Sequence, residues 1–154
     1  MRTEIIQAFV GAARDVLAQE IGEPVEPQKV KLQGGPYKTT DVTVLIGLAQ
    51  GIEGAVILGL TTETACHYIG HIMGEPVEEL DELAQSGIGE LANVIAGRAG
   101  ALLGERGYPT VIAPPTIILG QDTTLSMMSV PRLVVPMHTS VGVIELQLAA
   151  KERG

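Results

Sequence analysis

The long apolar pattern over residues 77–104 constrains the fold of this chain more than any other part of its sequence. Apolar residues recur there at the spacing of an α-helix and gather on one face, which another layer of structure must cover. Acidic residues crowd its start and arginines lie towards its end, as the dipole of a helix favours. The residues expected to face the core are Leu80, Leu83, Ala84, Ile88, Leu91, Val94, Ile95 and Leu102. One long helix packed against a second layer is therefore predicted.

The remaining sequence predicts that the second layer is a sheet. Two further amphipathic helices are predicted, at residues 3–19 and from residue 61 or 62 to Gly74. Runs rich in Val, Ile and Leu, typical of strands, occupy residues 41–50, 53–60, 110–119, 132–138 and 141–148. A hairpin is predicted for the first two runs, which are joined around Gly51, and another for the last two, with a tight turn at 139–142. This order predicts an α+β fold, with the helices on one face of a largely antiparallel sheet. Because no linker interrupts it, residues 1–154 are predicted to form a single domain.

Composition narrows the class of partner. The chain has 154 residues, a formal net charge of −8 and a pI near 4.8, so it repels nucleic acids and anionic membranes. Aromatic residues make up only 3% of it, too few for a base-stacking platform. Its single cysteine, Cys66, cannot form an internal disulfide, and no apolar run has the length of a bilayer span or the pattern of a signal peptide. We therefore expect a cytoplasmic protein whose partners are other proteins.

A stripe of polar and small residues lies along the predicted long helix, away from its core face. It comprises Ser86, Glu90, Asn93 and Gly97, with Gly89 beside it. Glycine costs about 1 kcal/mol relative to alanine inside a helix, so its repeated use here needs a reason. Small residues beside Glu90 and Asn93 would let another surface approach until both side chains reach into it. Alternatively, the stripe is a solvated helix face, and its glycines pack against a neighbouring helix.

The first predicted helix repeats the spacing of this stripe. Glu4, Gln7 and Gly11 are spaced like Glu90, Asn93 and Gly97 of the long helix. Both segments lie on predicted helices that precede strand-forming runs. An internal duplication is therefore a reasonable hypothesis, and a chance match over eight residues is its alternative.

Two other motifs suggest ligands but lack the context that ligand binding needs. A Gly-x-Gly-x-x-Ala run from Gly87 matches a dinucleotide fingerprint, but acidic, helix-forming residues precede it in place of a strand. Glu63, His67 and His71 would share one helix face and could offer metal ligands, yet no further Cys or His is identifiable to complete a site. A polar helix face is the simpler interpretation of those three residues. No metal and no cofactor of its own is therefore predicted for this chain.

The polar stripe resembles the signature of a known family. The motif Ser-x-x-x-Glu-x-x-Asn from Ser86 to Asn93, continuing as Val-Ile-Ala-Gly-Arg-Ala, is similar to that of the CheC, CheX and FliY-type chemotaxis phosphatases. The family pattern includes a proline slightly over twenty positions after the asparagine, and Pro114 and Pro115 occupy that region. The run Ala-Pro-Pro-Thr-Ile-Ile-Leu-Gly that ends at Gly120 most resembles the CheX branch.

The resemblance implies an activity and a role for each residue of the stripe. The substrate would be the aspartyl phosphate of a CheY-like response regulator in chemotaxis or related two-component signalling. Mg²⁺ would be bound by that regulator and not by this chain. Asn93 would position the attacking water, because its amide both donates and accepts hydrogen bonds, and Glu90 would pair with a lysine of the regulator. Ser86, Gly89 and Gly97 would contact the partner.

The resemblance also implies an assembly and leaves one alternative function open. CheX relatives are dimers, so a homodimer is expected, with a sheet edge within residues 132–148 as its candidate surface. Gln7 replaces the asparagine that CheC-like members carry on the first helix, and its longer side chain would misplace a water, so no second active site is expected. The alternative is a non-catalytic module of the same fold that binds or scaffolds a receiver.

Overall fold

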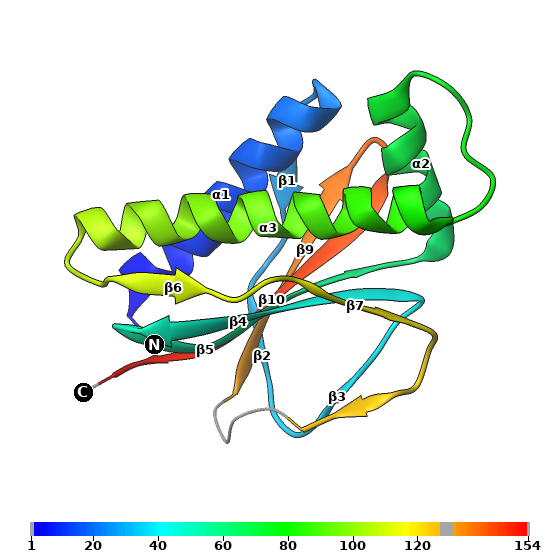
Figure 1. Ribbon diagram of the computed structural model, residues 1–154. Coiled ribbons are helices and arrows are strands. Elements are labelled where there is room, and N and C mark those ends of the chain that lie inside the picture. Colours follow the sequence, from blue (N-terminus) through cyan, green and yellow to red (C-terminus); the bar gives the residue numbers. More distant parts are fainter. Residues whose placement is uncertain (1, 127–130, 154) are drawn as a thin grey trace.

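The computed structural model of the protein describes residues 2–126 and 131–153, which form three helices on one face of a sheet (Figure 1). The helices are α1 (Thr3–Ile21), α2 (Thr62–Met73) and α3 (Glu82–Glu105). The strands are β1 (Glu26–Pro27), β2 (Lys31–Gln33), β3 (Tyr37–Lys38), β4 (Val42–Gln50), β5 (Ile52–Leu60), β6 (Thr110–Ile112), β7 (Thr116–Leu119), β8 (Thr124–Leu125), β9 (Arg132–Thr139) and β10 (Gly142–Glu152). This arrangement confirms the predicted α+β fold class.

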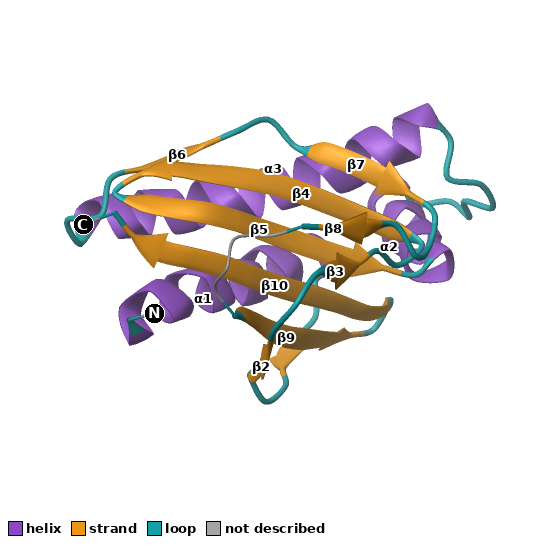
Figure 2. Cartoon of the chain, turned by 90° about the horizontal axis from the view of Figure 1, so that it is seen from below, coloured by secondary structure: helices purple, strands orange, loops and turns teal. Residues whose placement is uncertain are grey.

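The main sheet has eight strands, and every strand pairing that the structure describes is antiparallel. Its order is β1-β9-β10-β5-β4-β6, with β2 also paired to β9 and β7 also paired to β4. The two remaining strands, β3 and β8, pair with each other and cross the face of the sheet opposite the helices (Figure 2). The helices therefore cover one face of the sheet, and the β3–β8 pair covers part of the other.

The strand order is symmetric about its centre, where β5 pairs with β10. Of the short strands, β1 and β2 after α1 pair with β9, whereas β6 and β7 after α3 pair with β4. The segments before and after α2 thus each contribute one helix, edge strands and one hairpin, and the edge strands of each segment extend the hairpin of the other. This is the arrangement that an internal duplication would produce. Duplication itself stays a hypothesis.

The long helix begins later than its apolar pattern predicts. It starts at Glu82 and not at residue 77, because the side chain of Asp81 accepts a hydrogen bond from the Ala84 amide at 2.8 Å and caps the first turn. The preceding helix α2 ends at Gly74, which has the positive φ of 74° that favours glycine. The segment between these two caps is not helical.

Two residues expected in the core are exposed instead. Leu83 is 68% exposed and Val94 is 39% exposed, whereas Ile88, Leu91 and Ile95 are buried as predicted. The buried face of α3 is also rotated towards the small residues Ala92, Ala96 and Ala99, which allow close packing of neighbouring elements. Leu83 and Val94 therefore lie on the outer face of α3.

Strand boundaries were harder to predict than helix boundaries. The run at residues 110–119 is two strands, because it is interrupted at residues 113–115, where two prolines lack the amide hydrogen that a ladder needs. The short strands β1, β2, β3 and β8 were not predicted. The two predicted hairpins were correct: β4 pairs with β5, and β9 pairs with β10.

Among the described residues, no helix combines the length and the apolarity that crossing a bilayer requires.

Candidate active site

The predicted stripe lies on the outer face of α3. Ser86, Glu90 and Gly97 are exposed, and Asn93 is half-buried. Glu90 and Asn93 are three residues apart, so their side chains lie one turn apart on neighbouring parts of the helix surface. Neither side chain forms a hydrogen bond or an ion pair with any other residue that the structure describes. A carboxylate and an amide are therefore both available to an outside partner.

The glycines of α3 pack mainly against the protein itself. A Cβ atom added at Gly89 would lie 3.1 Å from Ile117 Cδ1, and one added at Gly87 would lie 2.6 Å from Ile69 Cδ1. Gly89 is buried and allows β7 to approach the helix, and its contact with a partner stays a prediction. Gly97 differs, because it is exposed and an added Cβ would meet only Ile112 Cδ1 at 3.9 Å. Gly97 thus remains available to a partner.

The half-buried position of Asn93 follows from these contacts. Helical geometry places residue 93 on the side of the stripe that Gly89 and Gly97 also occupy, and both of those glycines face the β6–β7 segment. Asn93 therefore lies beside residues 113–115, which connect the two strands. That connection is restrained by the two fixed φ angles of its prolines and by a 2.9 Å hydrogen bond from the Ala113 amide to the Gly47 carbonyl. The backbone that lies beside Asn93 is therefore restrained.

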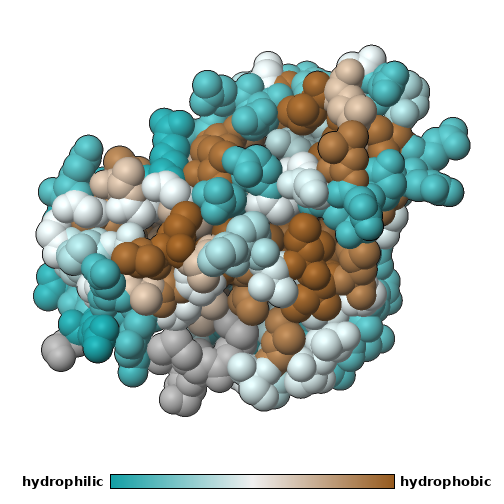
Figure 3. Space-filling model, viewed as in Figure 1, coloured by the Kyte–Doolittle hydropathy of each residue, from teal (hydrophilic) through white to brown (hydrophobic). Residues whose placement is uncertain are grey.

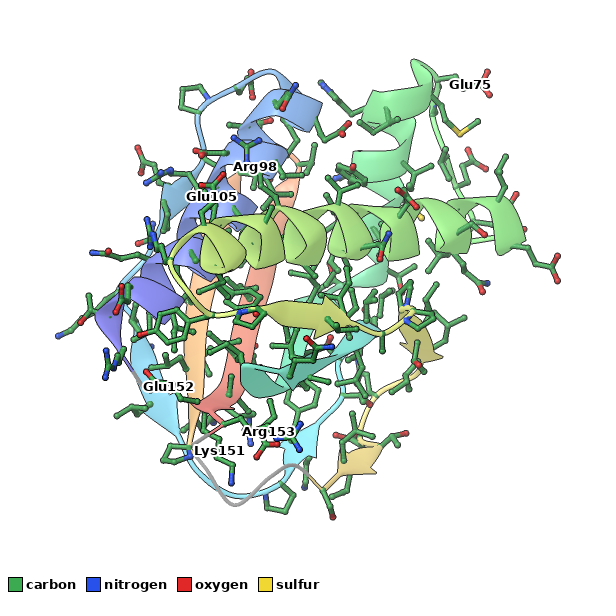
Figure 4. The ribbon with its side chains drawn as sticks, turned by 60° about the vertical axis from the view of Figure 1, so that its left-hand side comes forward. Glu75, Arg98, Glu105, Lys151, Glu152 and Arg153 are labelled. Carbon is green, nitrogen blue, oxygen red and sulfur yellow. The ribbon has the colours of Figure 1, made fainter. Side chains whose placement is uncertain are left out.

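The other flank of α3 is tied to α1. Arg98 Nη2 lies 3.7 Å from Asp15 Oδ2, and Figure 4 shows Arg98 on the side of α3 that borders α1. Both side chains are about half exposed, so the ion pair adds little stability. The packing of α1 and β6 against α3 fixes the rotation of this helix about its axis. The orientation of Glu90 and Asn93 is thereby set.

The corresponding residues of α1 have a different environment. Glu4 Oε1 accepts a hydrogen bond from the Tyr108 hydroxyl at 3.0 Å, and Arg2 Nη1 donates to the same hydroxyl at 3.1 Å. Arg106 Nη1 donates to the Glu4 carbonyl at 3.1 Å. Gln7 is exposed along a shallow groove of about 450 Å³ on the outer side of α1. The glutamate of this helix is therefore already occupied by its own chain.

Two other motifs, the possible metal ligands of α2 and the glycine-containing run of α3, were considered as ligand sites. Glu63, His67 and His71 are exposed on α2, and no group of three Cys, His, Asp or Glu residues within residues 2–126 and 131–153 is placed to hold a metal ion. The Gly-x-Gly-x-x-Ala run lies inside α3, with α-helix on both sides of it. It therefore lacks the strand-to-helix turn of a dinucleotide site.

Comparison with known proteins agrees with this arrangement. The family model "Chemotaxis phosphatase CheX" matches residues 42–138. The chain belongs to the CheX family. A curated member, the CheY-P phosphatase CheX of Thermotoga maritima, is 31% identical over 137 residues, which cover 84% of each chain.

Solved structures of CheX proteins have the same fold. The structure of the CheX–CheY–BeF₃–Mg²⁺ complex from Borrelia burgdorferi matches with a TM-score of 0.85 and 28% identity over 98% of this chain and 100% of the other. CheX from Desulfovibrio desulfuricans matches with a TM-score of 0.84 and 25% identity, covering 96% and 99% of the two chains. Both matches span almost the whole chain, including the three helices and the sheet.

Two features of the site were not predicted from the sequence. The exposed apolar residues Leu83 and Val94 lie on the same face of α3 as Glu90, although their helical spacing was interpreted as part of the core. Their positions seven residues before and four residues after Glu90 would have indicated this. The contact between Glu4 and Tyr108 joins residues more than 100 positions apart, and no local pattern indicates it.

Proposed function

We propose that this chain hydrolyses the aspartyl phosphate of a CheY-like response regulator, with Asn93 and Glu90 as its working residues. The observation that carries the proposal is the placement of an exposed glutamate and a half-buried asparagine one turn apart on α3, both without partners among the described residues. Membership of the CheX family and the CheX–CheY complex of the Borrelia relative support it.

Hydrolysis of an acyl phosphate needs little beyond a correctly placed water. Oxygen of the water attacks phosphorus, the bond between phosphorus and the aspartyl oxygen breaks, and the carboxylate leaves. The products are the free aspartate carboxylate and dihydrogen phosphate, which carries the oxygen and both protons of the water and can then release one proton to the solvent. An acyl phosphate has a good leaving group, so positioning and charge neutralisation supply most of the catalysis. The amide of Asn93 suits this task, since it accepts from and donates to a water without changing its own charge.

Glu90 is proposed to hold the regulator in place. A carboxylate at this position can form a charge-assisted hydrogen bond with a lysine beside the phosphorylation site of the receiver. Ser86 and Gly97 are exposed on the same stripe and are proposed to contact the receiver surface. We place the Mg²⁺ ion on the receiver, because the CheX complex from Borrelia was solved with CheY, BeF₃ and Mg²⁺. No cofactor of this chain takes part in the proposed reaction.

Three further proposals concern the whole protein. Residues 1–154 form one domain, because α1, α2 and α3 share one hydrophobic core with the sheet. The chain works in the cytoplasm, where phosphorylated receivers are found. It acts as a homodimer, as expected from its relatives. Light scattering at micromolar concentrations tests the dimer, and a mass of about 16 kDa at every concentration would contradict it.

The test of the proposed activity is phosphate release from phosphorylated receivers. Each CheY-like receiver of the same cell is phosphorylated and mixed with a small fraction of this protein in the presence of Mg²⁺. We expect the phosphate lifetime of at least one receiver to shorten, with many turnovers for each copy of the chain. Unchanged lifetimes for all receivers, under conditions where one of them binds, would favour the non-catalytic receiver-binding module instead.

A further inference from the structure

A small groove separates the end of α2 from the start of α3. Its volume is about 230 Å³, and its apolar walls include Met73 on α2 and Leu83 on α3. Met73 is 48% exposed and Leu83 is 68% exposed, and the buried Ile69 forms part of the floor. In Figure 3, hydrophobic atoms lie above and below the right-hand part of α3, which is its N-terminal half. The side chains of Met73 and Leu83 are thus exposed to solvent near the candidate active site.

One wall of the groove, Leu83, lies on the same side of α3 as Glu90 of the polar stripe. Leu83 lies seven residues before Glu90, so it occupies nearly the same side of α3 and is about 10 Å away along the helix axis. Val94, which is 39% exposed, extends the same side by one turn beyond Glu90. A receiver that contacts Glu90 and Asn93 is wide enough to cover Leu83 as well. The groove therefore falls within reach of any partner that uses the proposed site.

The charge around the groove is strongly negative. The sequence has no Lys or Arg between Lys38 and Arg98. The carboxylates that line the groove are Glu75, Glu78, Glu79 and Asp81, and none of them forms an ion pair with a described residue. Figure 4 shows Glu75 at the outer end of α2, pointing away from the fold. Such a surface attracts a positively charged partner and repels a negatively charged one.

The opposite end of α3 lacks these features. The exposed residues of its last turns include Ala101, Gly104 and Glu105, which are small or charged. Among the described residues of α3, the large apolar side chains that are exposed are Leu83 and Val94. The basic residues Arg98 and Arg106 also lie in or after this end. The two ends of the helix therefore differ in both polarity and charge.

We infer that the receiver extends from Glu90 towards the N-terminal end of α3 and inserts a basic segment with an apolar side chain into the groove. This inference rests on the proposed function. The apolar side chain would bury Leu83 and Met73, which adds affinity, and the basic residues would face the carboxylates, which speeds association. The groove would thereby help to select which receiver this protein serves, while Asn93 acts on the phosphoryl group.

The apolar part of the inference is tested with the double variant Leu83→Gln/Met73→Gln. Glutamine keeps the length and helix propensity of the exposed side chains, so the fold is retained. Affinity is measured by titration against the receivers of the same cell, each activated with BeF₃⁻ and Mg²⁺. We expect Kd to rise about fivefold or more and kcat to change less than twofold. Leu32→Gln is the matched control, because Leu32 is 71% exposed on β2, and its Kd should equal that of the unchanged protein.

The charged part is tested with Glu78→Gln/Glu79→Gln. We expect the association rate to fall about threefold at low salt, with the difference disappearing near 1 M salt, where the Debye length is about 3 Å. Glu23→Gln/Glu26→Gln removes two exposed carboxylates, one between α1 and β1 and one on β1, and should leave this rate unchanged. Thermal unfolding confirms that all variants are folded.

The outcomes separate this inference from the proposed function. If the unchanged protein releases phosphate but both groove variants match their controls in affinity and rate, the inference is overturned and the activity stands. If the unchanged protein binds an activated receiver without releasing phosphate, and the groove variants weaken that binding, the proposed phosphatase activity is overturned and receiver binding at the groove is supported. If the unchanged protein binds no receiver, both are overturned.

Discussion

The helices α1 and α3 occupy corresponding places in the two halves of the sheet, yet they present different chemistry to the solvent. Each precedes short strands that extend the hairpin of the other half, and each carries a glutamate followed three residues later by an amide side chain. On α3, both side chains are free of partners among the described residues. On α1, Glu4 accepts a hydrogen bond from Tyr108, and the amide is the longer Gln7. The comparison indicates that the spacing of two residues does not make a site unless both side chains are available.

The largest effect is expected from Asn93→Ala. Without the amide, the attacking water is no longer oriented, and phosphate release should fall about a hundredfold or more. Receiver affinity should stay within twofold, and the free energy of unfolding should change by at most about 0.7 kcal/mol, because alanine is the better helix former. Single-turnover phosphate release and titration with the BeF₃⁻-activated receiver measure the two quantities separately. Equal losses of turnover and affinity would show that Asn93 mainly binds.

Glu90→Ala should reduce affinity first. It removes a charge-assisted hydrogen bond and leaves the lysine of the receiver without its partner, so Kd should rise about tenfold or more. Glu105→Ala is the matched control, since Glu105 is also exposed on α3 but lies at its far end, as Figure 4 shows. Similar affinities for the two variants would remove Glu90 from the proposed interface.

Gly97→Ala should separate helix stability from partner contact. The added methyl group would meet no atom outside the helix closer than Ile112 Cδ1 at 3.9 Å. Because alanine is the better helix former, the free energy of unfolding should rise by about 0.5–1 kcal/mol. The same methyl should weaken receiver binding a few-fold, because it holds the partner surface away from α3. Gly104→Ala, with no heavy atom within 4 Å of the added Cβ, should give the stability gain alone. Chemical denaturation measures the change in the free energy of unfolding, and receiver titration measures the change in affinity. Unchanged affinity of the Gly97→Ala variant would show that Gly97 does not contact the receiver.

The smallest effect is expected from Tyr108→Phe. The variant loses the 3.0 Å hydrogen bond to Glu4, which is partly exposed to water, so the free energy of unfolding should fall by only about 0.5–1 kcal/mol. Phosphate release should stay the same, because freeing Glu4 does not shorten Gln7. A clear gain in turnover would mean that α1 retains a suppressed second site.

Much of the fold could be predicted because its helices and hairpins have local signals. These signals are the helical spacing of apolar residues in α1 and α2, the stops at Gly22 and Gly74, and the apolar runs of β9 and β10. Each of them involves residues that lie close together in the sequence. The short strands β1, β2, β3 and β8 could not be predicted, because strands of two or three residues depend on partners far along the chain. Their pairing energy comes from the assembled sheet and not from their own sequence.

The residues of the candidate site were proposed from the motif, whereas the structure around them could not be predicted. The positions of Glu90 and Asn93 on one helix face follow from helical geometry alone. Whether Leu83 and Val94 face the core depends on which neighbours cover α3, and those neighbours are brought there by long-range packing. The burial of Gly89 against Ile117 has the same cause. Sequence patterns specify the surface of an isolated helix, and tertiary contacts decide which part of it stays exposed.

The most direct test of the account compares Asn93→Ala with Gln7→Ala in one assay of phosphate release from the same phosphorylated receiver. The two positions have the same spacing from a glutamate on helices at corresponding places in the fold. The account predicts that Asn93→Ala abolishes most of the turnover, whereas Gln7→Ala retains the rate of the unchanged protein within twofold. Full turnover by Asn93→Ala together with its loss in Gln7→Ala would contradict the assignment of the active helix to α3.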